Sequence, residues 1–126
     1  MYSKMRTIRK KITKDYSILP MSPFTEVHVG SRTHIQPSDI VLVSADISYS
    51  YIYLSDGSRI IVSTNIQKLE ERFLAYQNMV RVHRSYMINT DYFLNLEGNK
   101  ILLANDIECI VSRRKRENLM DLIQLN

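Results

Sequence analysis

The sequence contains no tryptophan, only three glycines and three prolines, and a single cysteine, Cys109. A lone cysteine cannot form an internal disulfide or a zinc site of the CxxC type, so nothing indicates an oxidising compartment. Uninterrupted apolar runs stay far below the roughly 20 residues of a membrane span, and no apolar stretch follows the basic start MYSKMRTIRKK. The sequence therefore predicts a cytoplasmic protein without a membrane partner.

Patterns typical of catalytic and metal sites are also missing. His28, His34 and His83 form no close pair of metal ligands in the sequence, and no glycine-rich phosphate-binding loop occurs. Cys109 alternates with Val111 in an apolar run, which predicts a buried structural thiol rather than a nucleophile. Because no nucleophile can be paired with a base, we expect no catalytic residues, cofactor, metal or small-molecule substrate.

Positive charge is distributed unevenly along the chain. Residues 1–23 hold six basic residues against one acid, which leaves 11 basic and 12 acidic residues in the remainder. This charge run, with its two prolines, predicts a basic N-terminal arm over residues 1–23 and one domain over residues 24–126. The predicted domain is not basic as a whole, so anion binding depends on where its cations cluster. They cluster in two places, at Arg81 with Arg84 and at Arg113 to Arg116.

Short runs rich in β-branched and aromatic residues recur through the predicted domain and indicate a mainly β fold. These runs are FTEVHVG, DIVLVSA, SYIYLS, RIIVST, VRVHR, YFLNLE, KILLA and IECIVS. Asp56 with Gly57, and Gly98 with Asn99, are hairpin signals between neighbouring runs. Consecutive strands are therefore expected to pair antiparallel.

One segment between the strand runs has helical periodicity. Residues 65–76 predict a helix whose apolar face is formed by Ile66, Leu69 and Phe73. Thr64 is expected to cap this helix, because Gln67 follows three residues later in the spacing of a capping box.

The segment VRVHRSYMIN follows that helix and carries the first cation cluster. Alternation of period two predicts that Val80 and Val82 face the core and that Arg81 and His83 face outward. An arginine and a serine follow where the strand pattern ends, so a guanidinium and a hydroxyl are expected near a loop. Arginine can bond the O6 and N7 atoms of guanine, whereas histidine and serine suit phosphate oxygens. The alternative is a solvated strand face without a ligand.

The second cation cluster occupies the predicted first turn of another helix. This helix is expected to begin near Arg113, with Ser112 as its cap and an apolar stripe of Leu119, Leu122 and Ile123. An exposed cation at a helix N-terminus costs about 0.3 to 1 kcal/mol at low salt. An external anion would offset this cost, and the free backbone N–H groups suit a phosphate. If the helix instead starts later, the resulting basic loop would still attract phosphate.

Tyr49, Tyr51 and Tyr53 alternate along one predicted strand. Ordinary strand surface explains this row. A row of tyrosines can also stack single-stranded bases, which would make an RNA-binding module, but no lysine or arginine is interleaved with these residues.

Taken in order, the motifs of residues 24–126 resemble those of the LytTR DNA-binding domain of bacterial transcriptional regulators. The resemblance rests on SDIVLVSAD at 38–46, the DG pair at 56–57, NIQKLEERF at 65–73, MVRVHRSYMIN at 79–89 and IVSRRKRENL at 110–119. It implies an elongated arrangement of small antiparallel sheets with one short helix between strands and a C-terminal helix. It also implies sequence-specific binding of double-stranded promoter DNA by loops inserted into successive major grooves. Two copies, or a homodimer, would occupy paired short repeats.

The resemblance carries over residue by residue. It implies that Arg84 and Arg114 read bases, and that the phosphate contacts beside them come from His83, Ser85, Ser112 and Lys115. Arg113 is expected among the DNA-binding residues as well. The loop before SYIYLS is a third contact region, for which the resemblance implies the location but not the chemistry of Ser48, Tyr49 and Ser50. Asn89 belongs to the same motif but is expected to have a structural role.

Domains of this family usually follow a phosphorylation receiver or a membrane sensor, and 126 residues leave no room for either. The start at Met1 and the basic arm favour a stand-alone regulator over a fragment of a longer one. The competing functional interpretation is an RNA-binding or protein-interaction module that uses the same basic surface.

Overall fold

The computed structural model describes residues 25–124, so the predicted basic arm over residues 1–23 lies outside it. Its strands are β1 (Val27–Gly30), β2 (Thr33–Ile35), β3 (Ile40–Asp46), β4 (Tyr49–Leu54), β5 (Arg59–Val62), β6 (Met79–His83), β7 (Tyr86–Asn89), β8 (Phe93–Glu97), β9 (Lys100–Leu103) and β10 (Ile107–Ile110). The helix α1 (Ile66–Arg72) lies between β5 and β6, and α2 (Arg113–Gln124) follows β10. All pairings in the described range are antiparallel. The predicted mainly β fold with two helices is therefore confirmed.

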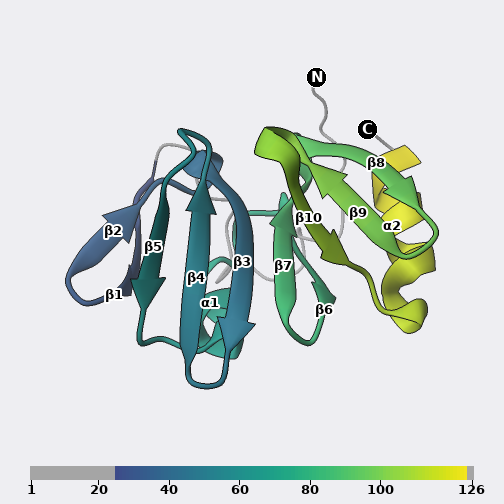
Figure 1. The fold of residues 1–126 in the computed structure, drawn as a ribbon. Helices are drawn as coiled ribbons and strands as arrows, with labels where there is room; N and C mark the ends of the chain where they lie inside the picture. Colours follow the sequence, from purple (N-terminus) through teal and green to yellow (C-terminus); the bar gives the residue numbers. More distant parts are fainter. Residues whose placement is uncertain (1–24, 125–126) are drawn as a thin grey trace.

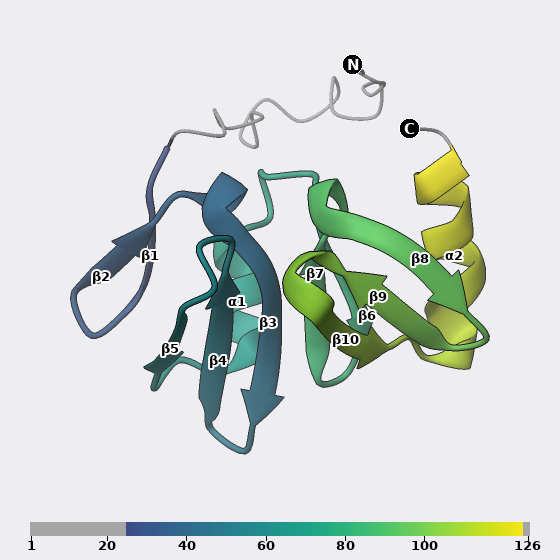
Figure 2. The same ribbon diagram turned by 45° about the horizontal axis from the view of Figure 1, so that its top comes forward.

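Three sheets lie side by side along the molecule (Figure 1). The hairpin of β1 and β2 is at one end, a five-stranded sheet in the order β5-β4-β3-β7-β6 is central, and a three-stranded sheet in the order β10-β9-β8 is at the other end. Figure 2 shows α1 behind the five-stranded sheet and α2 beside the three-stranded sheet. No helix of the described range is both long enough and apolar enough to cross a membrane.

Two hydrophobic cores hold these layers together. The first core lies between α1 and the five-stranded sheet and includes Val43, Ile52, Leu69, Phe73 and Met87. The second core joins the five-stranded sheet, the three-stranded sheet and α2, and includes Leu42, Ile88, Ile101, Cys109 and Leu119. The strands β3 and β7 contribute side chains to both cores, so each of these strands is buried on both faces.

The predicted hairpins are present at both sites. Asp56 accepts hydrogen bonds from the backbone N–H of Ser58 at 2.8 Å and from its hydroxyl at 2.6 Å, while Gly57 has a φ of 91°. Such a positive φ is readily adopted by glycine, because it has no Cβ. The second hairpin joins β8 to β9 through Gly98 and Asn99.

Two strands were not predicted from the sequence, β2 and β7. The strand β7 lies between β3 and β6 in its sheet, and Met87, Ile88 and Asn89 are buried in succession. Burial on both faces removes the alternation of polar and apolar residues that marks a half-buried strand, so β7 carries no period-two signal. Buried Asn89 is structural as expected, because its side chain donates to the Pro37 carbonyl at 3.3 Å and accepts from the Asp91 N–H at 2.9 Å.

The first helix is shorter than the predicted segment 65–76, and its cap differs. The side-chain oxygen of Asn65, not Thr64, accepts the Lys68 N–H at 2.9 Å. Both residue types are good N-caps, and the helix begins one residue later than the capping-box spacing suggested. The expected apolar face of Ile66, Leu69 and Phe73 is buried.

The second helix begins at Arg113 as predicted. The Ser112 hydroxyl accepts the Lys115 N–H at 3.3 Å, which confirms Ser112 as the cap. Leu119 is buried and Ile123 packs against the second core, whereas Leu122 of the predicted stripe is 39% exposed. Because α2 starts at Arg113, the alternative of a basic loop in its place is ruled out.

Candidate nucleic-acid interface

Three connections between elements lie along one side of the molecule. They are the β3–β4 turn, the β6–β7 turn and the start of α2, all on the lower side in Figures 1 and 2. The Ala45 N–H donates to the Ser85 carbonyl at 2.9 Å, and the Ser112 N–H donates to the Val82 carbonyl at 2.9 Å. These bonds connect the three segments in which the sequence placed contact residues. We call residues 46–49, 83–85 and 112–115 the loop edge.

The Arg81 side chain donates hydrogen bonds to backbone carbonyls of the β6–β7 turn. Its Nε donates to the His83 carbonyl at 2.9 Å and its Nη2 to the Arg84 carbonyl at 2.6 Å. Its Nη1 lies 2.7 Å from Glu70 Oε1 on α1, and only 15% of the Arg81 side chain is exposed. The expectation that Arg81 faces outward was wrong, because the five-stranded sheet is covered by α1 on the face that Arg81 shares with Met79. Arg81 is therefore a positioning residue for this turn.

Arg84 is the exposed cation of the β6–β7 turn, and its side chain makes no hydrogen bond or ion pair with the described residues. Beside it, His83 Nδ1 accepts the Ser85 N–H at 3.0 Å. Burial, and then the positive charges of Arg84 and Arg81, lower the pKa of His83 below its ordinary 6.5. A neutral histidine that accepts at Nδ1 carries its proton on Nε2 and can donate it to an anion.

The first turn of α2 is rich in positive charge and contains no acidic residue. Arg113 and Arg114 are exposed, and Lys115 is half-buried. Arg116 is used inside the protein, because its Nε donates to the Gly98 carbonyl in the β8–β9 turn at 2.9 Å. Two exposed guanidinium groups thus remain at a helix N-terminus, where free backbone N–H groups add to the positive potential.

The β3–β4 turn has a different character. Ser48 and Tyr49 are exposed, but Ser50 is completely buried and its hydroxyl donates to the Thr64 carbonyl at 2.7 Å. This burial removes Ser50 from the candidate contact residues, because the register of β4 turns its side chain toward the first core. The carboxylate of Asp46 accepts a hydrogen bond from the Tyr51 hydroxyl at 3.1 Å, which raises the pKa of Tyr51.

The row of tyrosines is not a free stacking surface. Tyr51 bonds Asp46 and lies under the guanidinium of Arg59, which is 4.7 Å from the ring centroid. Tyr53 packs against the second core, so Tyr49 is the member of the row that projects from the strand with 52% exposure.

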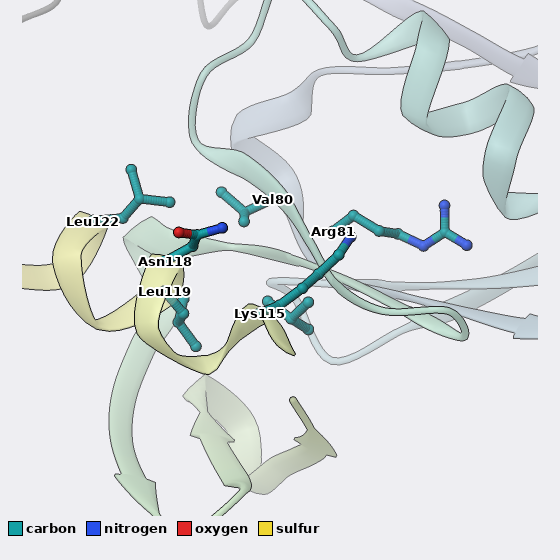
Figure 3. Close-up of a pocket in the computed structure, with 7 residues that line it drawn as sticks. Val80, Arg81, Lys115, Asn118, Leu119 and Leu122 are labelled. Carbon is teal, nitrogen blue, oxygen red and sulfur yellow. The ribbon is translucent and has the colours of Figure 1, made fainter. Parts of the chain in front are cut away.

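A shallow groove lies between α2 and β6, and its lining is shown in Figure 3. Lys115 extends from α2 across β6, while the guanidinium of Arg81 points away from the groove (Figure 3). Apart from these two cations the lining consists of apolar and amide side chains, namely Val80, Val82, Asn118, Leu119 and Leu122. The lining of the groove therefore contains no histidine, cysteine, hydroxyl or carboxylate side chain.

Cysteine and histidine side chains also occur outside the loop edge. Cys109 is buried as predicted, and burial raises the pKa of its thiol to about 12, so it is not poised as a nucleophile. His28 and His34, which form no close pair in the sequence, are cross-strand partners in the β1–β2 hairpin with ring centroids 5.0 Å apart. Gly30, which lies between the two histidines in the sequence, is a turn residue that could have indicated this pairing. Within the described range no three histidine, cysteine or acidic side chains gather as metal ligands.

Two transcriptional regulatory proteins from Salmonella are similar in sequence to this chain. The transcriptional regulatory protein BtsR of Salmonella typhi and that of Salmonella typhimurium are each 26% identical over 132 residues, covering 97% of this chain and 53% of the relative. The chain thus spans about half the length of these relatives, and its being a stand-alone regulator stays a prediction.

A solved structure shares the fold. It is a LytTr DNA-binding domain from Bacillus cereus, from a protein described as a methyl-accepting/DNA response regulator. The TM-score is 0.60 at 13% identity, over 79% of this chain and 94% of that one. Residues 30–124 match the LytTr DNA-binding domain family. This match includes the whole loop edge, and the chain belongs to the LytTr DNA-binding domain family.

Proposed function

We propose that this chain binds double-stranded DNA sequence-specifically by inserting the loop edge into the major groove, as part of a bacterial transcriptional regulator in the cytoplasm. The observation that carries the proposal is the joining of three connections into one edge by the bonds from Ala45 to Ser85 and from Ser112 to Val82. These bonds fix the distances between the side chains of the loop edge. Fixed distances are needed because base pairs present their donors and acceptors at regular intervals along the major groove.

Arg84 and Arg114 are the proposed base-reading residues. Both are exposed, and they come from two different connections of the edge. An arginine can form two hydrogen bonds to guanine O6 and N7, and this geometry distinguishes guanine from the other bases.

Phosphate contacts are assigned to the groups around these arginines. In the β6–β7 turn they are the Nε2–H of His83 and the hydroxyl of Ser85. At the start of α2 they are Ser112, Arg113, Lys115 and the free backbone N–H groups. Two copies of the domain, or a homodimer, would bind paired short repeats in a promoter.

The test is the selection of bound duplexes from a random pool, followed by binding measurements with variants. Arg84→Ala and Arg114→Ala should each weaken binding to the selected duplex by about 1 to 3 kcal/mol and relax the preference at one base position. Lys115→Ala should weaken binding similarly for all sequences and lower the slope of log affinity against log salt by about one.

Arg32→Ala is the matched control, because Arg32 is an exposed arginine in the turn between β1 and β2, outside the loop edge. It should change neither preference nor affinity. Unchanged base preference in both Arg84→Ala and Arg114→Ala would remove their assignment. If RNA competes as well as the selected duplex, the RNA-binding alternative is favoured instead.

A further inference from the structure

The tip of the β3–β4 turn carries an unusual residue, Ile47. Its side chain is 95% exposed, the highest value among the large hydrophobic residues that the structure describes. Its φ is 56°, in the left-handed region. The other non-glycine residues with positive φ in the described range are Ser31, Arg32, Asn105 and Asp106, so Ile47 is the β-branched member of this group.

Both properties of Ile47 are unfavourable in the free protein. A β-branched side chain disfavours the left-handed region, where glycine or asparagine is the usual choice in a two-residue hairpin turn. An exposed isoleucine also leaves its apolar surface in water, and no contact among the described residues compensates for this. Burial of this side chain against a partner would recover the second cost.

The charges around Ile47 indicate what kind of partner surface it meets. The flanking residue Asp46 carries a carboxylate, held by the Tyr51 hydroxyl at 3.1 Å, and residues 46–49 contain no cation. This acidic, apolar tip is unsuited to a phosphate backbone, in contrast with the two cationic parts of the loop edge. In the major groove, the apolar group that a base offers to a protein is the C5-methyl of thymine.

We propose that Ile47 is a specificity-determining residue that recognises thymine by packing against its C5-methyl group. The inference rests on the proposed function, because it requires the loop edge to enter the major groove. The two cationic connections read guanine and hold phosphates, and the β3–β4 turn adds selection for thymine by apolar contact.

The experiment replaces each thymine of the selected duplex, one at a time, by deoxyuridine, which lacks only the methyl group. With the wild-type protein, replacement at one or two positions should weaken binding by about 4- to 10-fold, the effect of one buried methyl group. Ile47→Ala should weaken binding to the original duplex by a similar factor. At those same positions deoxyuridine should then have no further effect, because protein and DNA changes remove the same contact.

Leu94→Ala is the control, because Leu94 is an exposed leucine, at 66%, in β8 and outside the loop edge. This variant should keep the full sensitivity to deoxyuridine. A second readout separates recognition from folding. Ile47→Asn should raise the melting temperature by a few degrees, because asparagine tolerates a positive φ, while abolishing the deoxyuridine effect.

The results that would contradict the role of Ile47 differ from those that would contradict the proposed function. If the wild-type protein is insensitive to every deoxyuridine, or if Ile47→Ala keeps the sensitivity, the role of Ile47 is overturned. When Arg84→Ala still relaxes specificity in that case, the proposed function stands. If no duplex is selected at all, both proposals are overturned together.

Discussion

The β6–β7 turn and the β3–β4 turn are neighbours on the loop edge, yet they are built in opposite ways. In the β6–β7 turn, Arg81 bonds two backbone carbonyls and Glu70, and His83 accepts the Ser85 N–H. In the β3–β4 turn, Ile47 stands in the left-handed region with its side chain in solvent.

The difference fits the role that we propose for each turn. A guanidinium reads a base only when its geometry is fixed, because its hydrogen bonds are directional. Arg81 turns the carbonyls of His83 and Arg84 inward, so the turn presents donors rather than acceptors to an anionic partner. An apolar contact is not directional, and the β3–β4 turn has no comparable set of hydrogen bonds at its tip.

Among the substitutions that test the difference between the two turns, Arg81→Ala should have the largest effect on stability and on DNA affinity. The substitution should lower the free energy of unfolding by about 1 to 3 kcal/mol, because it leaves two carbonyls and the partly buried Glu70 carboxylate without their donor. Urea unfolding followed by circular dichroism measures this loss. DNA affinity should fall too, because the Arg84 turn is no longer held.

Glu70→Gln is its matched control, since it keeps both bonds from Arg81 to the backbone carbonyls. It should therefore lose much less DNA affinity than Arg81→Ala. Equal DNA affinity in Arg81→Ala and the wild-type protein would show that the turn needs no positioning residue.

An intermediate effect of opposite sign is expected from Asp46→Asn. Removing a negative charge from the loop edge should strengthen DNA binding by about 0.3 to 1 kcal/mol at low salt, and the gain should shrink as salt is added. Fluorescence anisotropy at two salt concentrations measures it. The same change at Asp56, in the turn at the opposite end of the sheet, should leave affinity unaltered. Weaker binding by Asp46→Asn would mean that this carboxylate accepts a hydrogen bond from DNA.

The smallest effect concerns pH and His83. The folded-state pKa of His83 lies below its ordinary 6.5, so between these two values the unfolded chain binds more protons. Stability should therefore decrease as pH falls through 6.5, and protonation also removes the acceptor for the Ser85 N–H. Urea unfolding at pH 7.5 and 5.5 should show a smaller difference for His83→Asn, whose side-chain oxygen can replace Nδ1. Identical pH dependence in both proteins would refute this role of His83.

Local sequence patterns predicted the elements whose burial is one-sided. The two hairpin signals, the apolar face of α1 and the cap of α2 depend on neighbouring residues, and each was correct. The same patterns could not predict β7, which is buried on both sides, or the cap at Asn65, which depends on a one-residue difference between two good capping residues.

The candidate site was predicted less completely, because its chemistry depends on contacts distant in sequence. Period two assigned Arg81 to a face but could not show that Glu70 lies next to that face. The family resemblance placed Ser50 in the contact loop, whereas its buried hydroxyl donates to the Thr64 carbonyl. The left-handed backbone of Ile47 had no signal in the sequence at all, since glycine or asparagine normally marks such positions.

The placement of β7 has a further consequence for how the domain unfolds. Met87 belongs to the first core and the next residue, Ile88, to the second, so withdrawal of this strand opens both at once. Neither half can melt while the other keeps its full set of contacts. The molecule thus behaves as one cooperative unit, and the three connections of the loop edge are gained or lost together.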